Sequence, residues 1–256
     1  MQKRFVGGVC SLVLGLLAAG TPLKAQSESA RKPPMYAYIS QWAVPRAQWG
    51  EMAKIDEQDK ALEDKLLAAG TITAYGTLVN LIHTEGNATH ADFFWATSEG
   101  NILKALAAFY ARPDTTSSVF AASKHADHFV VTRIHNARSG NYEGGYLEGS
   151  MWIVKPGQMQ ALIAILKSTF VPILEKELAA GNVIFYSVET QDYHTEDPGT
   201  VIAVFAVPDA SAVDKLDAAF ESALEKDNEI GPAFGALTKR DSHRDFLYRV
   251  TSLVIK

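Results

Sequence analysis

Apolar side chains recur at steps of three and four residues between Pro156 and Gly181, which is the period of one face of an α-helix. The members of this stripe are Met159, Leu162, Ile163, Leu166, Phe170, Ile173 and Leu174. Proline suits the entry of a helix and glycine suits its end. The pattern therefore predicts one long amphipathic helix between these two residues.

The segments around this helix have the composition of β-strands. Residues 146–154, 183–194, 200–207 and 246–250 are rich in β-branched and aromatic side chains and are bounded by turn residues. A second apolar stripe with helical spacing follows residue 207. The predicted order of elements is β-α-β-β-α-β, with a loop before the last strand.

The first half of the chain shows the same order, with sequence matches 111 residues apart. Leu67-Ala68-Ala69-Gly70 recurs as Leu178-Ala179-Ala180-Gly181, Tyr75 as Tyr186, and His83-Thr84-Glu85 as His194-Thr195-Glu196. Further on, His125 and Asp127 match His243 and Asp245 at an offset of 118. The corresponding strands are predicted over 36–43, 71–83, 91–97 and 129–134, with a helix between Pro45 and Gly70. We interpret the chain as one unit used twice.

The domain boundaries follow from this repeat. We expect a signal peptide over 1–25, a linker over 26–34, a first repeat over 35–138, a Gly-rich linker over 139–145 and a second repeat over 146–256.

The order β-α-β-β-α-β is the ferredoxin-like split βαβ motif. One copy would cover one face of its sheet with helices and leave the other bare, so two copies are expected to pack sheet against sheet. The predicted fold class is α+β, with tandem ferredoxin-like repeats that form a pseudo-dimeric barrel. This arrangement resembles the dimeric α+β barrel superfamily, which includes antibiotic-biosynthesis-type monooxygenases, EthD-like and NIPSNAP-like proteins, and the haem-binding chlorite dismutase group. The resemblance rests on element order and implies a fold more than a reaction.

The N-terminus has the pattern of a secretory signal. Lys3 and Arg4 precede an apolar run that is too short to span a bilayer, and the run is followed by a small residue, Ala25. We expect export to the periplasm or beyond, with cleavage near Ala25. The only cysteine, Cys10, would leave with the signal unless it is lipidated, so the mature chain would hold no disulfide.

Charge excludes one class of partner. The chain has 24 Lys and Arg against 29 Asp and Glu, a formal net charge of −5, whereas nucleic-acid binders present concentrated positive charge. We expect a small-molecule ligand, no nucleic acid, no membrane span in the mature chain, and a monomer or homodimer.

The repeated His-Thr-Glu triplets are the first candidate site. Histidine and glutamate two residues apart on a strand share a face, so His83 with Glu85, or His194 with Glu196, could act as an acid/base pair. His90 lies across the turn, so His83, Glu85 and His90 could alternatively ligate a metal. A third reading is structural, with the triplets supporting their turns through hydrogen bonds.

Several other residues are candidates for ligand contact. Tyr75 and Tyr186 lie on the same strands as the triplets, Trp42 and Trp152 lie on the first strands, and Arg133 could bind a carboxylate. Each also has a reading as a packing or surface residue.

The predicted function is binding of a small apolar or aromatic molecule in the cavity between the two sheets, with cofactor-independent oxygenase or isomerase chemistry as an extension. The alternatives are a metal or haem protein that uses His83, Glu85 and His90, and a non-catalytic structural protein of the cell envelope. The sequence contains no P-loop, no G-x-S-x-G and no H-E-x-x-H motif. Whether the protein is an enzyme, and whether it holds a cofactor, stays open at this point.

Overall fold

The computed structural model describes residues 32–84, 86–112 and 117–256. The expected signal peptide, Cys10 and most of the expected N-terminal linker lie outside the described residues. Within the described part of the chain, no helix has both the length and the apolar character needed to cross a membrane.

The first half follows the predicted order and adds two short helical elements. Its elements are β1 (Met35–Ala43), a 3₁₀ turn (Arg46–Gln48), α1 (Trp49–Ala68), β2 (Ala74–Asn80), β3 (His90–Ala96), α2 (Glu99–Tyr110), α3 (Ser118–Ala122) and β4 (Lys124–Ala137). The short helix α3 occupies the segment expected to be a loop. Strand β2 ends at Asn80, three residues before the predicted end, so His83 is not on a strand.

The second half repeats this order with one interruption. Its elements are β5 (Gly140–Tyr142), β6 (Tyr146–Ile153), α4 (Met159–Ile165), a π-helical turn (Leu166–Phe170), α5 (Val171–Ala180), β7 (Phe185–Tyr193), β8 (Thr200–Val207), α6 (Ala210–Lys226), α7 (Ile230–Leu237) and β9 (Arg244–Ile255). The predicted long helix is thus broken by a π turn. The expected linker 139–145 contains β5, which pairs with the long last strand β9.

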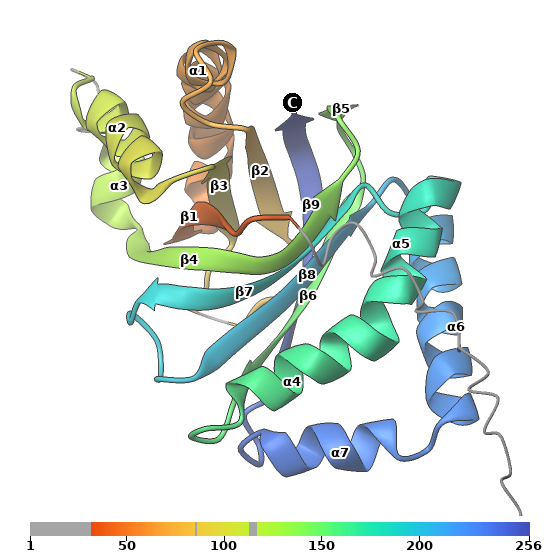
Figure 1. The fold of residues 1–256 in the computed structure, drawn as a ribbon. Helices are drawn as coiled ribbons and strands as arrows, with labels where there is room; N and C mark the ends of the chain where they lie inside the picture. Colours follow the sequence, from red (N-terminus) through yellow and green to blue (C-terminus); the bar gives the residue numbers. More distant parts are fainter. Residues whose placement is uncertain (1–31, 85, 113–116) are drawn as a thin grey trace, which may run out of the picture.

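The strands form one closed antiparallel barrel. Their order is β2-β3-β1-β4-β7-β8-β6-β9, and pairing of β9 with β2 closes the ring, while β5 pairs with the C-terminal end of β9. Helices α1 to α3 lie against one side of the barrel and α4 to α7 against the other (Figure 1). A single chain therefore completes the barrel and leaves no long edge open for pairing.

Alternation along the strands divides the side chains into a barrel core and two outer layers. The barrel core is centred on Phe93, Trp95 and Phe185, whose rings lie 4.8–6.1 Å apart. Each outer layer packs under the helices of its own half. Gly149 lies opposite Phe246, and a side chain at this position would collide with the phenyl ring inside the barrel.

The first long helix of each half is tied to its sheet by a tyrosine. The Tyr75 hydroxyl donates to Asp64 on α1 at 2.7 Å, and the Tyr186 hydroxyl donates to Glu175 on α5. Both tyrosine side chains are fully buried in the outer layers. The matched sequence positions thus take matched places in the fold.

Candidate functional site

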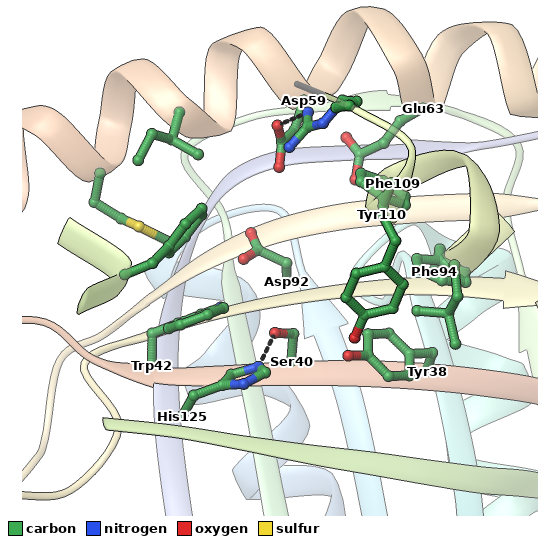
Figure 2. Close-up of a pocket in the computed structure, with 15 residues that line it drawn as sticks. Tyr38, Ser40, Trp42, Asp59, Glu63, Asp92, Phe94, Phe109, Tyr110 and His125 are labelled. Carbon is green, nitrogen blue, oxygen red and sulfur yellow. Dashed lines mark hydrogen bonds and ion pairs between the residues drawn. The ribbon is translucent and has the colours of Figure 1, made fainter. Parts of the chain in front are cut away.

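A cavity of about 280 Å³ lies between the helices of the first half and the outer face of its sheet (Figure 2). We call it the helix-covered pocket. It is lined by Tyr38, Ser40, Trp42, Met52, Ile55, Asp59, Glu63, Asp92, Phe94, Leu106, Phe109, Tyr110, Arg112, Phe120 and His125. Strands β1, β3 and β4 supply its floor, and helices α1, α2 and α3 supply its walls.

Aromatic rings form most of the walls. Phe94 lies between Tyr38 and Phe109, with ring centroids 5.3 and 5.8 Å away, and Trp42 lies 4.6 Å from Phe120. Tyr110 is 70% exposed, which places it where the pocket meets solvent. Rings arranged in this way can enclose a flat apolar ligand.

Three carboxyl groups enter the same pocket. Asp59 and Glu63 descend from α1 and face Asp92, which rises from β3 (Figure 2). Asp59 forms an ion pair with Arg112, which follows α2. The pocket therefore holds three acidic side chains and one basic side chain, in a setting partly closed to water.

Burial and mutual repulsion raise the pKa values of the carboxyl groups of Glu63 and Asp92. Burial, with the nearby charges of Asp59 and Asp56, raises the pKa of Glu63 to about 8. Burial, and then Asp56 and Glu63, raise the pKa of Asp92 well above its ordinary value. Burial and Asp59 also raise the pKa of the neighbouring Asp56 to about 7. Groups that titrate near neutral pH can donate or accept a hydrogen bond and can transfer a proton.

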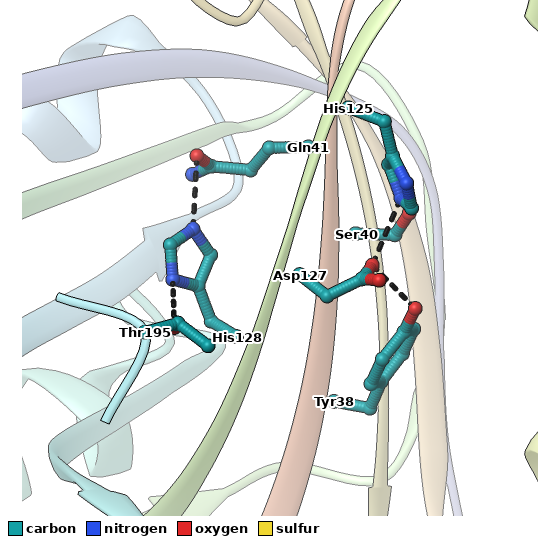
Figure 3. A network of polar contacts seen from close by, with 7 residues as sticks. All are labelled: Tyr38, Ser40, Gln41, His125, Asp127, His128 and Thr195. Atoms are coloured by element: carbon teal, nitrogen blue, oxygen red, sulfur yellow. Dashed lines mark hydrogen bonds and ion pairs between the residues drawn. The ribbon is translucent and has the colours of Figure 1, made fainter. Parts of the chain in front are cut away.

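A histidine network borders the pocket on its β4 side. The Nε2 atom of His125 lies 2.8 Å from both Ser40 Oγ and Asp127 Oδ1, and the Tyr38 hydroxyl donates to Asp127 (Figure 3). The His125 ring also stacks on Trp42 at 3.7 Å. Burial alone would raise the pKa of Asp127, but the hydrogen bonds from His125 and Tyr38 lower it.

This network is not a nucleophilic triad. In a triad the histidine contacts the serine through one nitrogen and the carboxylate through the other, whereas here one nitrogen contacts both. The second half has a similar arrangement, since His243 stacks on Trp152 at 5.0 Å and lies 2.8 Å from Asp245, although its serine, Ser150, donates to the aspartate instead of contacting the histidine. A feature present in both halves is best explained as support for the strand ends and for the tryptophan ring.

The carboxyl groups, in contrast, belong to the first half alone. At the offset of 111 residues, Asp59, Glu63 and Asp92 correspond to Phe170, Leu174 and Ala203. There Phe170 and Phe205 pack on Phe220 at 5.6 and 5.8 Å, and the space between helices and sheet is filled.

The predicted acid/base residues of the first half lie away from this pocket. His83 is exposed, and Glu85 lies outside the described residues. His90 is buried, 5.0 Å from the Trp49 ring, and burial together with His83 lowers its pKa to about 4. The imidazoles of His83 and His90 both border Trp49, at 6.0 and 5.0 Å. The structure thus brings the two histidines to one ring, while the role of Glu85 stays a prediction.

The triplet of the second half is exposed and reaches the barrel rather than the pocket. His194 lies on the surface, whereas Glu196 lies 3.8 Å from the Nδ1 atom of His128 and borders the barrel interior. His194 and Glu196 therefore do not line the helix-covered pocket, and their predicted acid/base role stays a prediction.

Of the predicted ligand contacts, only Trp42 lines this pocket. Tyr75 and Tyr186 are packing residues whose hydroxyls bind helix carboxylates, and Trp152 is covered by Phe234 and His243. Arg133 is exposed, and its Nε donates to Thr190 at 2.9 Å. The two tyrosines do not line the helix-covered pocket, because their strand face is covered by α1 and α5.

Neither a metal nor a haem fits the residues of this pocket. Among the described residues, no three His, Cys, Asp or Glu side chains are arranged to hold a metal ion. A haem needs an available axial ligand, but Nε2 of His125 is engaged by Asp127 and Ser40. The one arginine that lines the pocket, Arg112, is engaged by Asp59.

Sequence reasoning missed the carboxyl groups, although the repeat contained the signal. Asp59 and Glu63 occupy positions that belong to the apolar stripe in the second half, and Asp92 replaces an alanine there. When one half has a charged residue at a position that is apolar in the other half, packing does not explain that residue, and it indicates a site.

Comparisons with known proteins agree on the fold. No protein-family model matches the chain, and no curated protein does. A solved structure of a proposed monooxygenase from Lactobacillus acidophilus NCFM superimposes with a TM-score of 0.64 at 11% identity, over 88% of this chain and 97% of the other. An anthrone oxidase-like protein gives 0.56 at 11% identity, over 89% and 95%. A variant of chlorite dismutase from Candidatus Nitrospira defluvii gives 0.51 at 13% identity, over 88% and 92%. At these identities the likeness concerns architecture: the chain has the α+β barrel fold of these proteins, with the barrel closed within one polypeptide.

Proposed function

We propose that this protein binds a small aromatic molecule with a hydrogen-bond-donating group in the helix-covered pocket of its first half. The observation that carries this proposal is the set of three carboxyl groups, Asp59, Glu63 and Asp92, enclosed by aromatic rings. Burial of such groups costs free energy unless each is fully paired. The second half builds the same fold with apolar residues at these positions, so folding does not require them.

The lining sets the class of ligand. The aromatic walls favour a flat ring system, and a volume of about 280 Å³ exceeds the cavity of about 150 Å³ that holds one benzene ring. Carboxylates accept hydrogen bonds, so a hydroxyl or amine on the ring would satisfy Glu63 or Asp92. This location differs from the expected one between the sheets, because the pocket lies between the helices of the first half and the outer face of its sheet.

Binding of 2-naphthol, with naphthalene for comparison, tests this proposal. We expect saturable binding of 2-naphthol that is at least tenfold tighter than that of naphthalene, measured by the quenching of tryptophan fluorescence. Leu106→Trp fills the pocket and should weaken 2-naphthol binding at least tenfold. Leu103→Trp on the same helix is the matched control, because Leu103 is 53% exposed and lies outside the pocket lining. Equal binding by both variants would rule out the pocket.

The raised carboxyl pKa values favour one chemical extension of this binding function. A carboxylate whose pKa lies near 8 is a stronger base than an ordinary glutamate, which suits removal of a proton next to a carbonyl. That step begins isomerase-type and cofactor-independent oxygenase-type reactions, with Glu63 or Asp92 as base in place of His83 or His194. Exchange of the α-protons of α-tetralone with D₂O, followed by NMR, tests this extension. We expect exchange to be slowed at least tenfold by Asp92→Ala with Glu63→Leu, and an unchanged rate would exclude these bases.

We further propose that the protein is exported, as its first 25 residues suggest. Mass spectrometry of the periplasmic fraction should find a chain that begins at Gln26. An uncleaved chain in the cytoplasm would contradict export.

A further inference from the structure

The barrel encloses a second cavity, on the opposite face of β1 and β3 from the helix-covered pocket. Its volume is about 170 Å³, and most of its lining is apolar. Phe93, Trp95 and Phe185 form one wall, and Leu147, Val204 and Phe246 form much of the rest. Because an apolar cavity of about 150 Å³ holds one benzene ring, this one matches a single six-membered ring.

One carboxyl group lies within this apolar lining. Glu189 on β7 is 2% exposed, and its Oε1 accepts a hydrogen bond from Ser187 at 2.7 Å. Burial raises the pKa of Glu189 to about 7. The matching residue of the first half is Leu78, which lines the same cavity. The barrel can therefore be packed with leucine here, and the carboxyl group is not needed to close it.

Another polar side chain on the same strand, that of Gln191, has no hydrogen-bond partner among the described residues. Gln191 is two residues from Glu189, and its strand neighbour Val130 belongs to the barrel core. Both the Oε1 and Nε2 atoms of Gln191 are buried, and neither has a hydrogen-bond partner among the described residues. Unpaired buried amides are rare because they cost free energy, so this end of the barrel has unused hydrogen-bonding capacity.

The cavity has a polar end through which a ligand can enter. His128 lies there between Gln41 and Thr195, at 3.2 and 3.3 Å (Figure 3). Glu196 borders the cavity with a side chain that is 41% exposed, so the cavity reaches the surface at this loop. Gln41, His128 and Glu196 form the rim, and Glu189 lies inside it.

We propose that the barrel interior is a second ligand site, which takes one single-ring apolar molecule whose one hydroxyl group donates a hydrogen bond to Glu189. The aromatic wall receives the ring, and the carboxyl group selects ligands that carry the hydroxyl. A site built around a buried acceptor rejects the analogue that lacks the donor, because the acceptor is then left unpaired.

Calorimetric titration with phenol and with benzene tests the site, since the two probes differ by one hydroxyl. We expect wild-type protein to bind phenol at least tenfold more tightly than benzene. Glu189→Leu copies the first half and should abolish that preference, whereas Glu189→Gln keeps an acceptor and should retain part of it. Ala91→Leu should weaken both probes at least tenfold by filling the cavity, and Ala107→Leu on the exposed face of α2 should change neither.

Leu106→Trp, the variant that fills the helix-covered pocket, distinguishes the two sites. Leu106→Trp should leave phenol binding unchanged while it removes 2-naphthol binding. Loss of phenol binding in Leu106→Trp would place the probe in the helix-covered pocket and overturn the proposal. Absence of saturable phenol binding, or an equal phenol preference in wild type and Glu189→Leu, would also overturn it. Far-ultraviolet circular dichroism of each variant checks that it is folded.

Discussion

The two helix-covered faces of the barrel share one design and differ in what fills it. In the second half, Phe170, Leu174 and Phe220 join a continuous apolar layer. In the first half, Asp59 and Glu63 replace the first two of these residues and leave a cavity of about 280 Å³. The second half shows how apolar side chains fill this layer of the fold, and the first half shows where a cavity and carboxyl groups take their place.

The comparison separates residues that support the fold from residues that serve a site. The stacked Trp-His pairs and the tyrosine-to-helix hydrogen bonds occur in both halves. Carboxyl groups at the positions of Asp59, Glu63 and Asp92 occur in the first half only. Proteins commonly give up stability at functional sites, so we expect the first half to become more stable when it is made like the second.

The largest effect should come from moving a carboxyl group into the filled layer. Leu174→Glu introduces a glutamate at the position of the second half that matches Glu63, where the leucine is 7% exposed and surrounded by apolar groups. An uncompensated buried charge costs about 3–5 kcal/mol, so unfolding in urea at pH 8 should show a loss of this size. A loss below about 1 kcal/mol would mean that the second half tolerates charge as the first does.

The reciprocal change should stabilise the protein. Glu63→Leu removes a carboxyl group that is 4% exposed and lies among Asp56, Asp59 and Asp64. Replacement of buried ionic groups by apolar ones stabilises proteins by about 1–4 kcal/mol, and we expect a gain in this range at pH 8. Urea unfolding of both variants side by side provides the measurement, and a destabilised Glu63→Leu would show that Glu63 supports the fold.

The pH dependence of stability sharpens the same point. Glu63 ionises near 4.5 in the unfolded chain and near 8 in the folded one, so it destabilises the fold progressively as the pH rises from 4.5 through 8. Below pH 4.5 it is protonated in both states and has no such effect. Wild-type stability should therefore fall across this window more steeply than that of Glu63→Leu. Parallel pH profiles would contradict the raised pKa.

The smallest difference between the two halves is expected at their matched tyrosines. Tyr75→Phe and Tyr186→Phe each remove one hydrogen bond to a helix carboxylate, which is worth about 1.5–3 kcal/mol for a charged acceptor. Thermal unfolding of the two variants should give similar losses. A clearly larger loss for one tyrosine would show that the halves differ in more than their cavities.

The element order and the barrel were predictable from the sequence because they depend on periodicity and on the repeat. The π turn at Leu166–Phe170 and the short helix α3 were not, since local irregularities leave no periodic signal. The site predicted from the sequence and the site proposed from the structure differ for a related reason. The sequence prediction chose residues that match between the two halves, such as His83 and His194. The cavity is lined instead at positions where the two halves differ, such as Glu63 against Leu174.

The most direct test of the account is an amide and methyl NMR titration of the protein with 2-naphthol. We predict concentration-dependent shifts at residues around the helix-covered pocket, such as Ile55 and Leu106, and none at Leu166 and Leu174 in the second half. Shifts confined to the second half, or shared equally by both halves, would contradict the claim that the carboxyl groups of the first half mark the binding site.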